Sequence, residues 1–219
     1  LLLAGTFVDT GFTCGDATVN SKAAWADFDN DGYADLHLNG VIWHNDAGTG
    51  FTRMAGIKPI ADVNPTLVST DAVLGDFNND GLVDVFFYVT LDLYQNVDGT
   101  SFVCANHLLP TMSNNNSVGA AWGDLNGDGY LDLYIGGEEE PNFVYHPDRI
   151  LMNNQGQGFS LAWEQASGFQ PARGITMADF DEDNDLDIYV SNYRLEPNQL
   201  WENNGLAAFT NAGPAKGVD

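Results

Sequence analysis

The sequence has few basic residues: seven Lys and Arg stand against 31 Asp and Glu, which gives a formal net charge of −24. Binding to nucleic acid through its phosphates is therefore excluded, because almost no cationic side chain can neutralise them. An anionic membrane surface would repel the chain for the same reason. We expect the acidic residues either to be solvated or to be neutralised by bound cations.

Cysteines and long apolar runs are also scarce. The two cysteines, Cys14 and Cys104, are compatible with one disulfide or with two free buried thiols. No apolar run reaches the roughly 18 residues of a membrane-spanning helix, so membrane insertion is not expected. The chain begins with three leucines and no Met, which points to a processed or partial chain rather than to a signal peptide.

The composition allows a folded core. The chain has 219 residues, of which 44% are hydrophobic and 12% aromatic. That content is enough to bury a core in one large domain or two small ones, and it argues against disorder despite the charge.

One acidic pattern, Asp-x-Asp/Asn-x-Asp-Gly/Asn-x-x-Asp, occurs four times. Its copies are spaced by 49, 48 and 55 residues and begin at Asp27, Asp76, Asp124 and Asp179. A large and then a small residue precede each copy, and alternating apolar residues follow it, which predicts β-strands on both sides. Each unit ends in an Asn- and Gly-rich turn followed by Phe, which predicts a hairpin leading into an outer strand.

Each unit of roughly 50 residues is therefore expected to hold about four short antiparallel strands, with no helix in the chain. Such units in series are typical of a β-propeller. The expected class is all-β, with one propeller-type domain over 1–219 or part of a larger propeller. Trp25 and Trp122, before the first and third loops, are expected to pack in the core. The predicted units cover residues 20–51, 70–102, 117–159 and 172–209.

The acidic loops and the endings Leu-Tyr/Trp-x-Asn-x-Gly-x-x-x-Phe resemble the FG-GAP or VCBS repeats of integrin-type propellers. The resemblance runs from about residue 20 to residue 210. It implies propeller blades with a calcium loop in each, and a secreted or cell-surface module for binding, adhesion or structural assembly. Loop sites of this kind need millimolar calcium, which exists outside the cell.

The spacing of the acidic side chains suits Ca²⁺, which takes about six to eight hard oxygen ligands at flexible angles. Loop positions 1, 3, 5 and 9 would supply side-chain oxygens and position 7 a backbone carbonyl, while position 6 must turn at positive φ. Mg²⁺ fits less well because it needs strict octahedral geometry, and an all-oxygen set disfavours Zn²⁺. One copy could equally be a turn with solvated carboxylates, but four copies favour about four Ca²⁺ ions. The predicted ligands are Asp27, Asp29, Asp31, Tyr33, Asp35, Asp76, Asn78, Asp80, Leu82, Asp84, Asp124, Asn126, Asp128, Tyr130, Asp132, Asp179, Asp181, Asp183, Asp185 and Asp187.

The connection between the second and third strands is longer in the last two units, at residues 136–149 and 191–198. Because strands alternate in direction, these insertions are expected on the face opposite the calcium loops. In the resembled propellers that face commonly carries ligand contacts, so a protein or carbohydrate ligand is expected there; an ordinary variable loop is the alternative. The candidate contacts are Glu138, Glu139, Glu140, Tyr145, His146, Arg149, Tyr193 and Arg194.

Catalysis finds little support. Neither a nucleophile-elbow motif nor a His-Glu-x-x-His motif occurs, and most acids are assigned to metal. His37 is expected to be a packed or edge side chain of a strand. The alternative function is a secreted lyase or hydrolase acting on polysaccharide or lipid, because some proteins with such repeats are enzymes of those classes.

The points within the repeat unit at which the chain begins and ends indicate how it assembles. The same Phe recurs at one point of every unit, at Phe7, Phe51, Phe102, Phe159 and Phe209. The chain thus opens and closes with the end of a unit, and a four-unit ring would hold a surplus outer strand. An open arc would expose apolar faces, so we expect self-association or continuation into a larger propeller.

Overall fold

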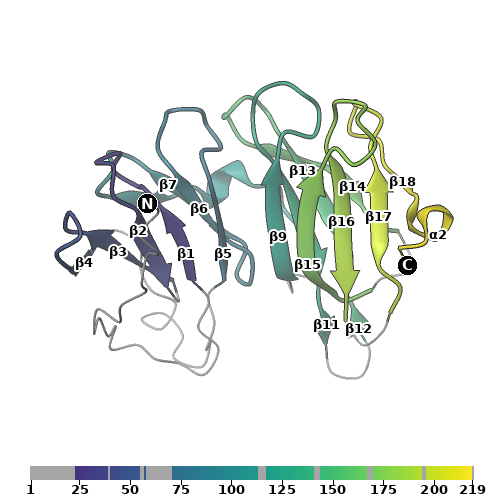
Figure 1. Ribbon diagram of the computed structural model, residues 1–219, viewed down its shortest axis with the longest axis horizontal. Coiled ribbons are helices and arrows are strands. Elements are labelled where there is room, and N and C mark those ends of the chain that lie inside the picture. The colour runs from purple at the N-terminus through teal and green to yellow at the C-terminus, as the bar shows by residue number, and fades with distance from the viewer. Residues whose placement is uncertain are drawn as a thin grey trace, which may run out of the picture.

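Four antiparallel sheets, each of four strands, make up most of the computed structural model, which describes residues 23–38, 40–54, 57, 71–112, 117–140, 144–166, 170–193 and 196–218 (Figure 1). The all-β class predicted from the sequence is confirmed. Phe7, Cys14 and Arg194 lie outside the described residues.

Each sheet is built from strands that follow one another in the chain. The first contains β1 (Ala23–Ala26), β2 (Asp35–Leu38), β3 (Val41–Asn45) and β4 (Phe51–Arg53). The second contains β5 (Ala72–Gly75), β6 (Asp84–Phe87), β7 (Asp92–Asn96) and β8 (Phe102–Cys104). The third contains β9 (Ser117–Gly123), β10 (Asp132–Gly137), β13 (Arg149–Asn153) and β14 (Phe159–Glu164). The fourth contains β15 (Ala172–Ala178), β16 (Asp187–Asn192), β17 (Gln199–Glu202) and β18 (Thr210–Asn211).

Four short elements lie outside these sheets. The insertion of the third unit forms a hairpin of β11 (Glu139–Glu140) and β12 (Val144–Tyr145). A 3₁₀ turn, η1 (Asn106–Leu108), follows β8, and a single helical turn, α2 (Gly213–Lys216), follows β18. The expectation of no helix is therefore wrong for these two short segments, which come after outer strands.

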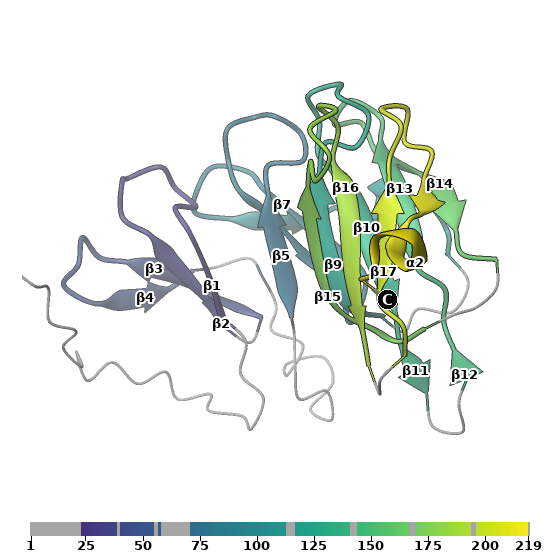
Figure 2. The same cartoon turned by 45° about the vertical axis from the view of Figure 1, so that its right-hand side comes forward.

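The sheets are arranged side by side in chain order. The first strands of consecutive sheets contact one another: β1 contacts β5, β5 contacts β9, and β9 contacts β15. Both views place the first and fourth sheets at opposite ends of the array, so within the described ranges the sheets form an open series and not a closed ring (Figures 1 and 2).

The core lies between consecutive sheets. Phe28, which follows β1, packs edge-on against Phe102 of β8 with ring centroids 5.6 Å apart. Phe77 occupies the same place after β5 and meets Phe159 of β14 at 5.7 Å. Leu125, after β9, belongs to a cluster with residues of the fourth sheet. Each of the first three acidic loops therefore contributes its second residue to the interface with the next sheet.

The two ends of the series differ from its middle. Trp122 of β9 packs against Phe86 of the preceding sheet at 6.1 Å, as expected for a core tryptophan. Trp25, at the same position of β1, is 59% exposed, so the expectation that it is a core residue is wrong. At the other end Phe180 is 38% exposed, whereas its equivalent Phe77 is fully buried. Within the described chain, no sheet covers the outer sides of the first and fourth sheets.

Two further expectations concern single side chains. His37 in β2 is buried, as predicted, and its ring lies 5.6 Å from that of Phe87. Cys104 in β8 is a free and exposed cysteine, so a buried thiol is the wrong description of this residue.

Candidate metal centre

The four acidic loops connect the first and second strands of each sheet, and all four lie at the same end of the series, at the top in Figure 1. Each loop must reverse the chain within nine residues. The sixth position carries the sharp turn with positive φ, as the sequence predicts: Gly32 at 91°, Gly81 at 89°, Gly129 at 89° and Asn184 at 76°. A glycine adopts this conformation without steric cost, and Asn tolerates it better than most residues.

The carboxylate at position 1 folds back onto the backbone of its own loop. In the third loop, Asp124 Oδ1 accepts the N–H of Asp128 at 3.0 Å, and its Oδ2 accepts the N–H of Gly129 at 2.8 Å. Asp128 Oδ1 in turn accepts the N–H of Tyr130 at 3.0 Å. The same three hydrogen bonds recur in the other loops, so the carboxylates at positions 1 and 5 point into every loop.

The carboxylate at position 9 is the buried member of each loop: Asp35, Asp84, Asp132 and Asp187 are at most 2% exposed. Asp132 Oδ2 accepts the N–H of Leu125 at 2.9 Å, and Oδ1 accepts that of Asn153 at 2.8 Å. The other three loops repeat this pair of bonds. Position 9 thereby joins the loop to the third strand of its own sheet.

Burial and neighbouring acids act against ionisation in these loops. The pKa of Asp84 is raised to about 7 and that of Asp132 to about 6. Burial is the main cause, the backbone hydrogen bonds oppose it, and the carboxylates at positions 1 and 5 add to it. Burial and then the charge of Asp183 also raise the pKa of Asp181 in the fourth loop. A bound divalent cation would reverse these effects, because it favours the charged form of each carboxylate.

The donor atoms fit a hard cation. In the fourth loop, carboxylate oxygens of Asp179, Asp181 and Asp187 lie within 4.8 Å of one another. Asp185 Oδ1 in the same loop is buried and has no hydrogen-bond partner. The second and third loops offer only oxygens at positions 1, 3, 5 and 9, which is the donor type that Ca²⁺ prefers. The residues present therefore suit calcium.

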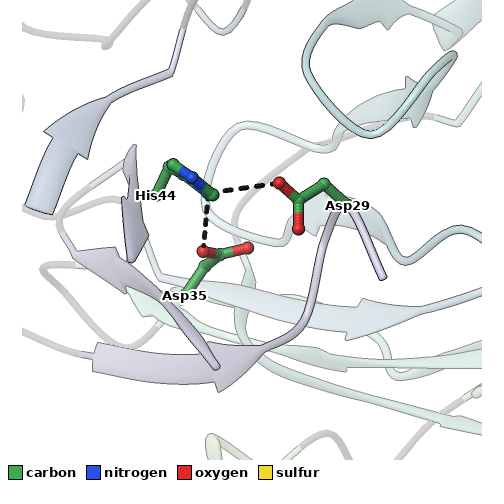
Figure 3. A group of neighbouring side chains, drawn as sticks. All are labelled: Asp29, Asp35 and His44. Carbon is green, nitrogen blue, oxygen red and sulfur yellow. Dashed lines mark ion pairs between the residues drawn. The ribbon is translucent and has the colours of Figure 1, made fainter. Parts of the chain in front are cut away.

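The first loop contains a residue that the sequence reasoning missed. His44 of β3 lies beside the loop, and its Nδ1 is 3.3 Å from Asp29 Oδ2 and 3.2 Å from Asp35 Oδ1 (Figure 3). Only its place at the end of the third strand, directly before a recurring Asn, could have indicated this contact.

The recurring Asn is a second feature whose function the sequence did not reveal. Asn96 Nδ2 donates to the backbone oxygen of Phe28 in the first loop at 2.8 Å. Asn153 makes the equivalent bond to Phe77 at 2.7 Å, and Asn203 the equivalent bond to Leu125 at 2.9 Å. Each of the first three loops is thus held by an Asn at the end of the third strand of the following sheet, as well as by its own sheet.

The Gly that lies three residues after this Asn allows consecutive sheets to come close together. A Cβ on Gly156 would lie 3.0 Å from the Cα of Asn78 in the second loop, and one on Gly99 would lie 2.8 Å from the Cα of Asp29. Both glycines have positive φ, at 76° and 80°. The motif Asn-x-x-Gly therefore lets the hairpin of one sheet approach the acidic loop of the preceding sheet closely.

The predicted ligand surface at the opposite end is only partly exposed. The hairpin β11–β12 projects away from the acidic loops, as expected (Figure 1). However, His146 is 5% exposed and Arg149 1% exposed, and Arg149 Nε is bonded to Glu164 Oε2 at 2.7 Å, so these two are wrong as surface contacts. Tyr193 is 44% exposed, with the guanidinium carbon of Arg173 4.4 Å from its ring centroid.

A buried carboxylate lies close to this insertion. Asp148 is fully buried; it accepts the hydroxyl of Tyr134 at 2.5 Å and the N–H of Gly137 at 2.7 Å. Burial raises its pKa to about 6, although both hydrogen bonds lower it. The group fixes the end of the insertion to the second strand of the sheet, β10.

None of the helices in the described part of the chain is long and apolar enough to cross a membrane.

Comparison with known proteins gives two findings. The chain is similar to the V. cholerae biofilm matrix protein Bap1, with 17% sequence identity and a TM-score of 0.46; the similarity covers 71% of this chain and 22% of that one. A search of curated proteins gives no match. Residues 76–135, which contain the second and third acidic loops, match the family of FG-GAP-like repeats, and this part of the chain is therefore an FG-GAP-like repeat segment.

Proposed function

We propose that the protein is an extracellular, calcium-stabilised module of β-propeller type that serves adhesion or structural assembly. The observation that carries the proposal is the concentration of charge: 16 of the 31 acidic residues fall within the four nine-residue loops. Their carboxylates lie at one end of four equivalent sheets. FG-GAP-like repeats in the middle of the chain support the same reading.

Calcium would act on the structure through the loop contacts. Positions 1, 3 and 5 would hold the ion, and the buried position 9 carboxylate would connect it to the third strand. The Asn of that strand bonds the loop of the preceding sheet, as Asn153 does with Phe77. An ion in one loop would therefore strengthen both its own sheet and the contact between sheets. Binding that requires the folded loop adds directly to the stability of the fold.

The test is a melting curve in calcium and in chelator. Without calcium, mutually repelling carboxylates stay uncompensated, so the melting temperature should fall strongly in chelator. Added Ca²⁺ should restore it and Mg²⁺ should restore it poorly, because Mg²⁺ dehydrates reluctantly. The same melting curve in chelator and in calcium, together with no calcium in elemental analysis, would contradict the proposal.

We also propose that the outer sides of the terminal sheets pack against further sheets of the same kind, from a second copy or from continuing chain. Trp25 and Phe180 are exposed where Trp122 and Phe77 are covered by a neighbouring sheet. Light scattering should detect association that Trp25→Glu weakens. A chain that stays monomeric at high concentration would contradict association between copies.

A ligand surface at the opposite end is a separate proposal. The exposed ring of Tyr193, next to Arg173, is a suitable platform for a carbohydrate or protein ligand. A carbohydrate array compared between the wild type and Tyr193→Ala would test it. Turnover assays with polysaccharides and lipids would test the enzymatic alternative.

A further inference from the structure

The four sheets differ from one another at one position of the third strand, close to the acidic loop. The residue directly before the recurring Asn differs in every sheet: it is His44, Gln95, Met152 or Glu202. The strand pairing places these four residues at equivalent positions. Each is paired with the residue that directly follows the recurring Phe, in the fourth strand of its sheet. The side chain of His44 reaches the acidic loop of its sheet, whereas Met152 packs in the apolar cluster between the third and fourth sheets.

His44 is directed at the first loop. Its Nδ1 lies 3.3 Å from Asp29 Oδ2 at loop position 3 and 3.2 Å from Asp35 Oδ1 at position 9 (Figure 3). The three ligand atoms of this group are all within 4.8 Å of one another. Nε2 is farther from any acid, at 3.9 Å from Asp46 Oδ1. The ring thus presents one nitrogen to two carboxylates, one in the loop and one at the start of β2.

The ring nitrogen has no other use in the structure. Nδ1 is buried and has no hydrogen-bond partner, although two carboxylate oxygens are close enough to accept one. The N–H or lone pair of Nδ1 therefore does not point at either carboxylate oxygen. One nitrogen and two carboxylate oxygens are thus gathered in a group of three potential ligand atoms, all within 4.8 Å of one another.

We propose that the first loop is a mixed nitrogen and oxygen site that selects a transition metal of the Zn²⁺ type over Ca²⁺, with His44 Nδ1, Asp29 and Asp35 as ligands. This inference rests on the proposed function, because it concerns one of the same cation loops. Around a tetrahedral ion with bonds of roughly 2.0–2.1 Å, ligand atoms are separated by about 3.3 Å. The distances from Nδ1 to the two carboxylate oxygens, 3.3 and 3.2 Å, agree with this value.

The chemistry of the donors decides the preference. Ca²⁺ takes oxygen ligands, whereas neutral imidazole is a common ligand of Zn²⁺ and of other first-row metals. An imidazole in place of an oxygen therefore lowers the affinity for Ca²⁺ and raises that for Zn²⁺. Asp27 and Asp31, which share the loop with Asp29, remain available to complete the coordination.

The other three loops lack this nitrogen. The amide of Gln95 and the carboxylate of Glu202 can offer only oxygen as a metal ligand, and the Met152 thioether is a poor ligand for a hard ion. Glu202 lies close enough to the fourth loop for its charge to raise the pKa of Asp181. The second, third and fourth loops should thus keep the calcium preference, and one chain would hold two kinds of metal.

The experiment measures metal content after the full chain is dialysed against Zn²⁺ in excess Ca²⁺. It uses the Cys104→Ser chain, because the exposed thiol could bind Zn²⁺ by itself. We expect one Zn²⁺ per chain, with a shift of the ¹⁵N resonance of His44 Nδ1. His44→Gln, which copies the second sheet, should lose this ion, while His107→Gln should keep it, because His107 is exposed on η1.

A gain-of-site variant makes the test independent of any loss of folding. Gln95→His places an imidazole at the equivalent position of the second sheet, whose loop contains Asn78 and Asp84, and it should add a second Zn²⁺. Zn²⁺ content that is equal in wild type and His44→Gln, or absent in the wild type, would overturn the inference. The proposed function fails separately, if the same samples contain no Ca²⁺ and their melting does not respond to chelator.

Discussion

Asn153 donates a hydrogen bond from Nδ2 to the backbone oxygen of Phe77, 2.7 Å away and 76 positions earlier in the chain. The same amide nitrogen donates to Leu131 at 2.9 Å, and Oδ1 accepts the N–H of Gly156 at 2.7 Å. The backbone N–H of Asn153 bonds Asp132 in the acidic loop. A single buried residue thus joins a hairpin, its own loop and the loop of the preceding sheet.

Replacing this residue should be costly. Asn153→Ala leaves the buried oxygens of Phe77 and Leu131 without their donor, which we expect to lower the free energy of unfolding by roughly 2–4 kcal/mol. Urea unfolding measures the change. Asn45→Ala is the matched control, because Asn45 Nδ2 bonds Ala34 of its own loop, and no described sheet precedes it. Equal losses in the two variants would show that the bond between sheets contributes nothing.

The hairpin glycine offers a second test with an internal control. Gly48 and Gly156 have nearly the same backbone conformation, with φ of 78° and 76°, so Ala should cost each roughly 1 kcal/mol through strain. A Cβ at position 48 meets nothing within 4 Å, but one at position 156 would approach Asn78 Cα to 3.0 Å. Gly156→Ala should therefore destabilise the protein by at least about 1 kcal/mol more. Similar denaturation midpoints for the two variants would contradict the close approach.

The third loop allows a single metal ligand to be removed. Asp128→Ala should reduce the calcium content by one ion and lower the melting temperature in calcium, by on the order of 2–4 °C for each kcal/mol lost. Part of the loss should persist in chelator, since Asp128 also accepts the N–H of Tyr130. Elemental analysis and calorimetry measure the two effects.

The control for that variant comes from the opposite end of the same sheet. Glu138→Ala changes an acid in the insertion next to β11, so it should leave the calcium content unaltered. An ion lost from Glu138→Ala would show that the assignment of the two faces is incorrect.

Asp148 predicts a defined pH dependence of stability. Its pKa is about 6 in the folded protein against 3.8 for an ordinary Asp, so the folded state binds more protons between these values. Its contribution to stability is therefore present below pH 4 and is lost as the pH rises through 6. Asp148→Asn removes this titration. The free energy of unfolding of the wild type, relative to that of the variant, should then decrease by roughly 3 kcal/mol at most between pH 4 and pH 7.

Urea unfolding of both proteins across this pH range checks the prediction. The comparison cancels the contribution of His37, whose pKa is lowered to about 4 by burial and which therefore acts in the opposite direction. Parallel stability curves for the two proteins would show that Asp148 does not titrate in this range.

The acidic loops and their turns could be predicted from the sequence because their determinants are local. Positive φ at Gly129 follows from the need to reverse the chain within nine residues, and the Asp124 bonds span only four and five positions. Alternation of apolar residues likewise placed the strands on either side of each loop. Such features depend on backbone geometry and on neighbours within one unit, so four copies of one pattern were sufficient to find them.

Contacts between units were decided by the tertiary structure. Trp25 and Trp122 have the same local sequence, yet only Trp122 meets a preceding sheet, and Trp25 is 59% exposed. The approach of His44 to Asp29 depends in the same way on how the third strand lies beside the loop. The sequence by itself determined the repeat, the loops and the class of ligand atoms. Which side chains are buried or brought to an ion was determined by the packing of strands and sheets, because packing joins residues that no short-range pattern relates.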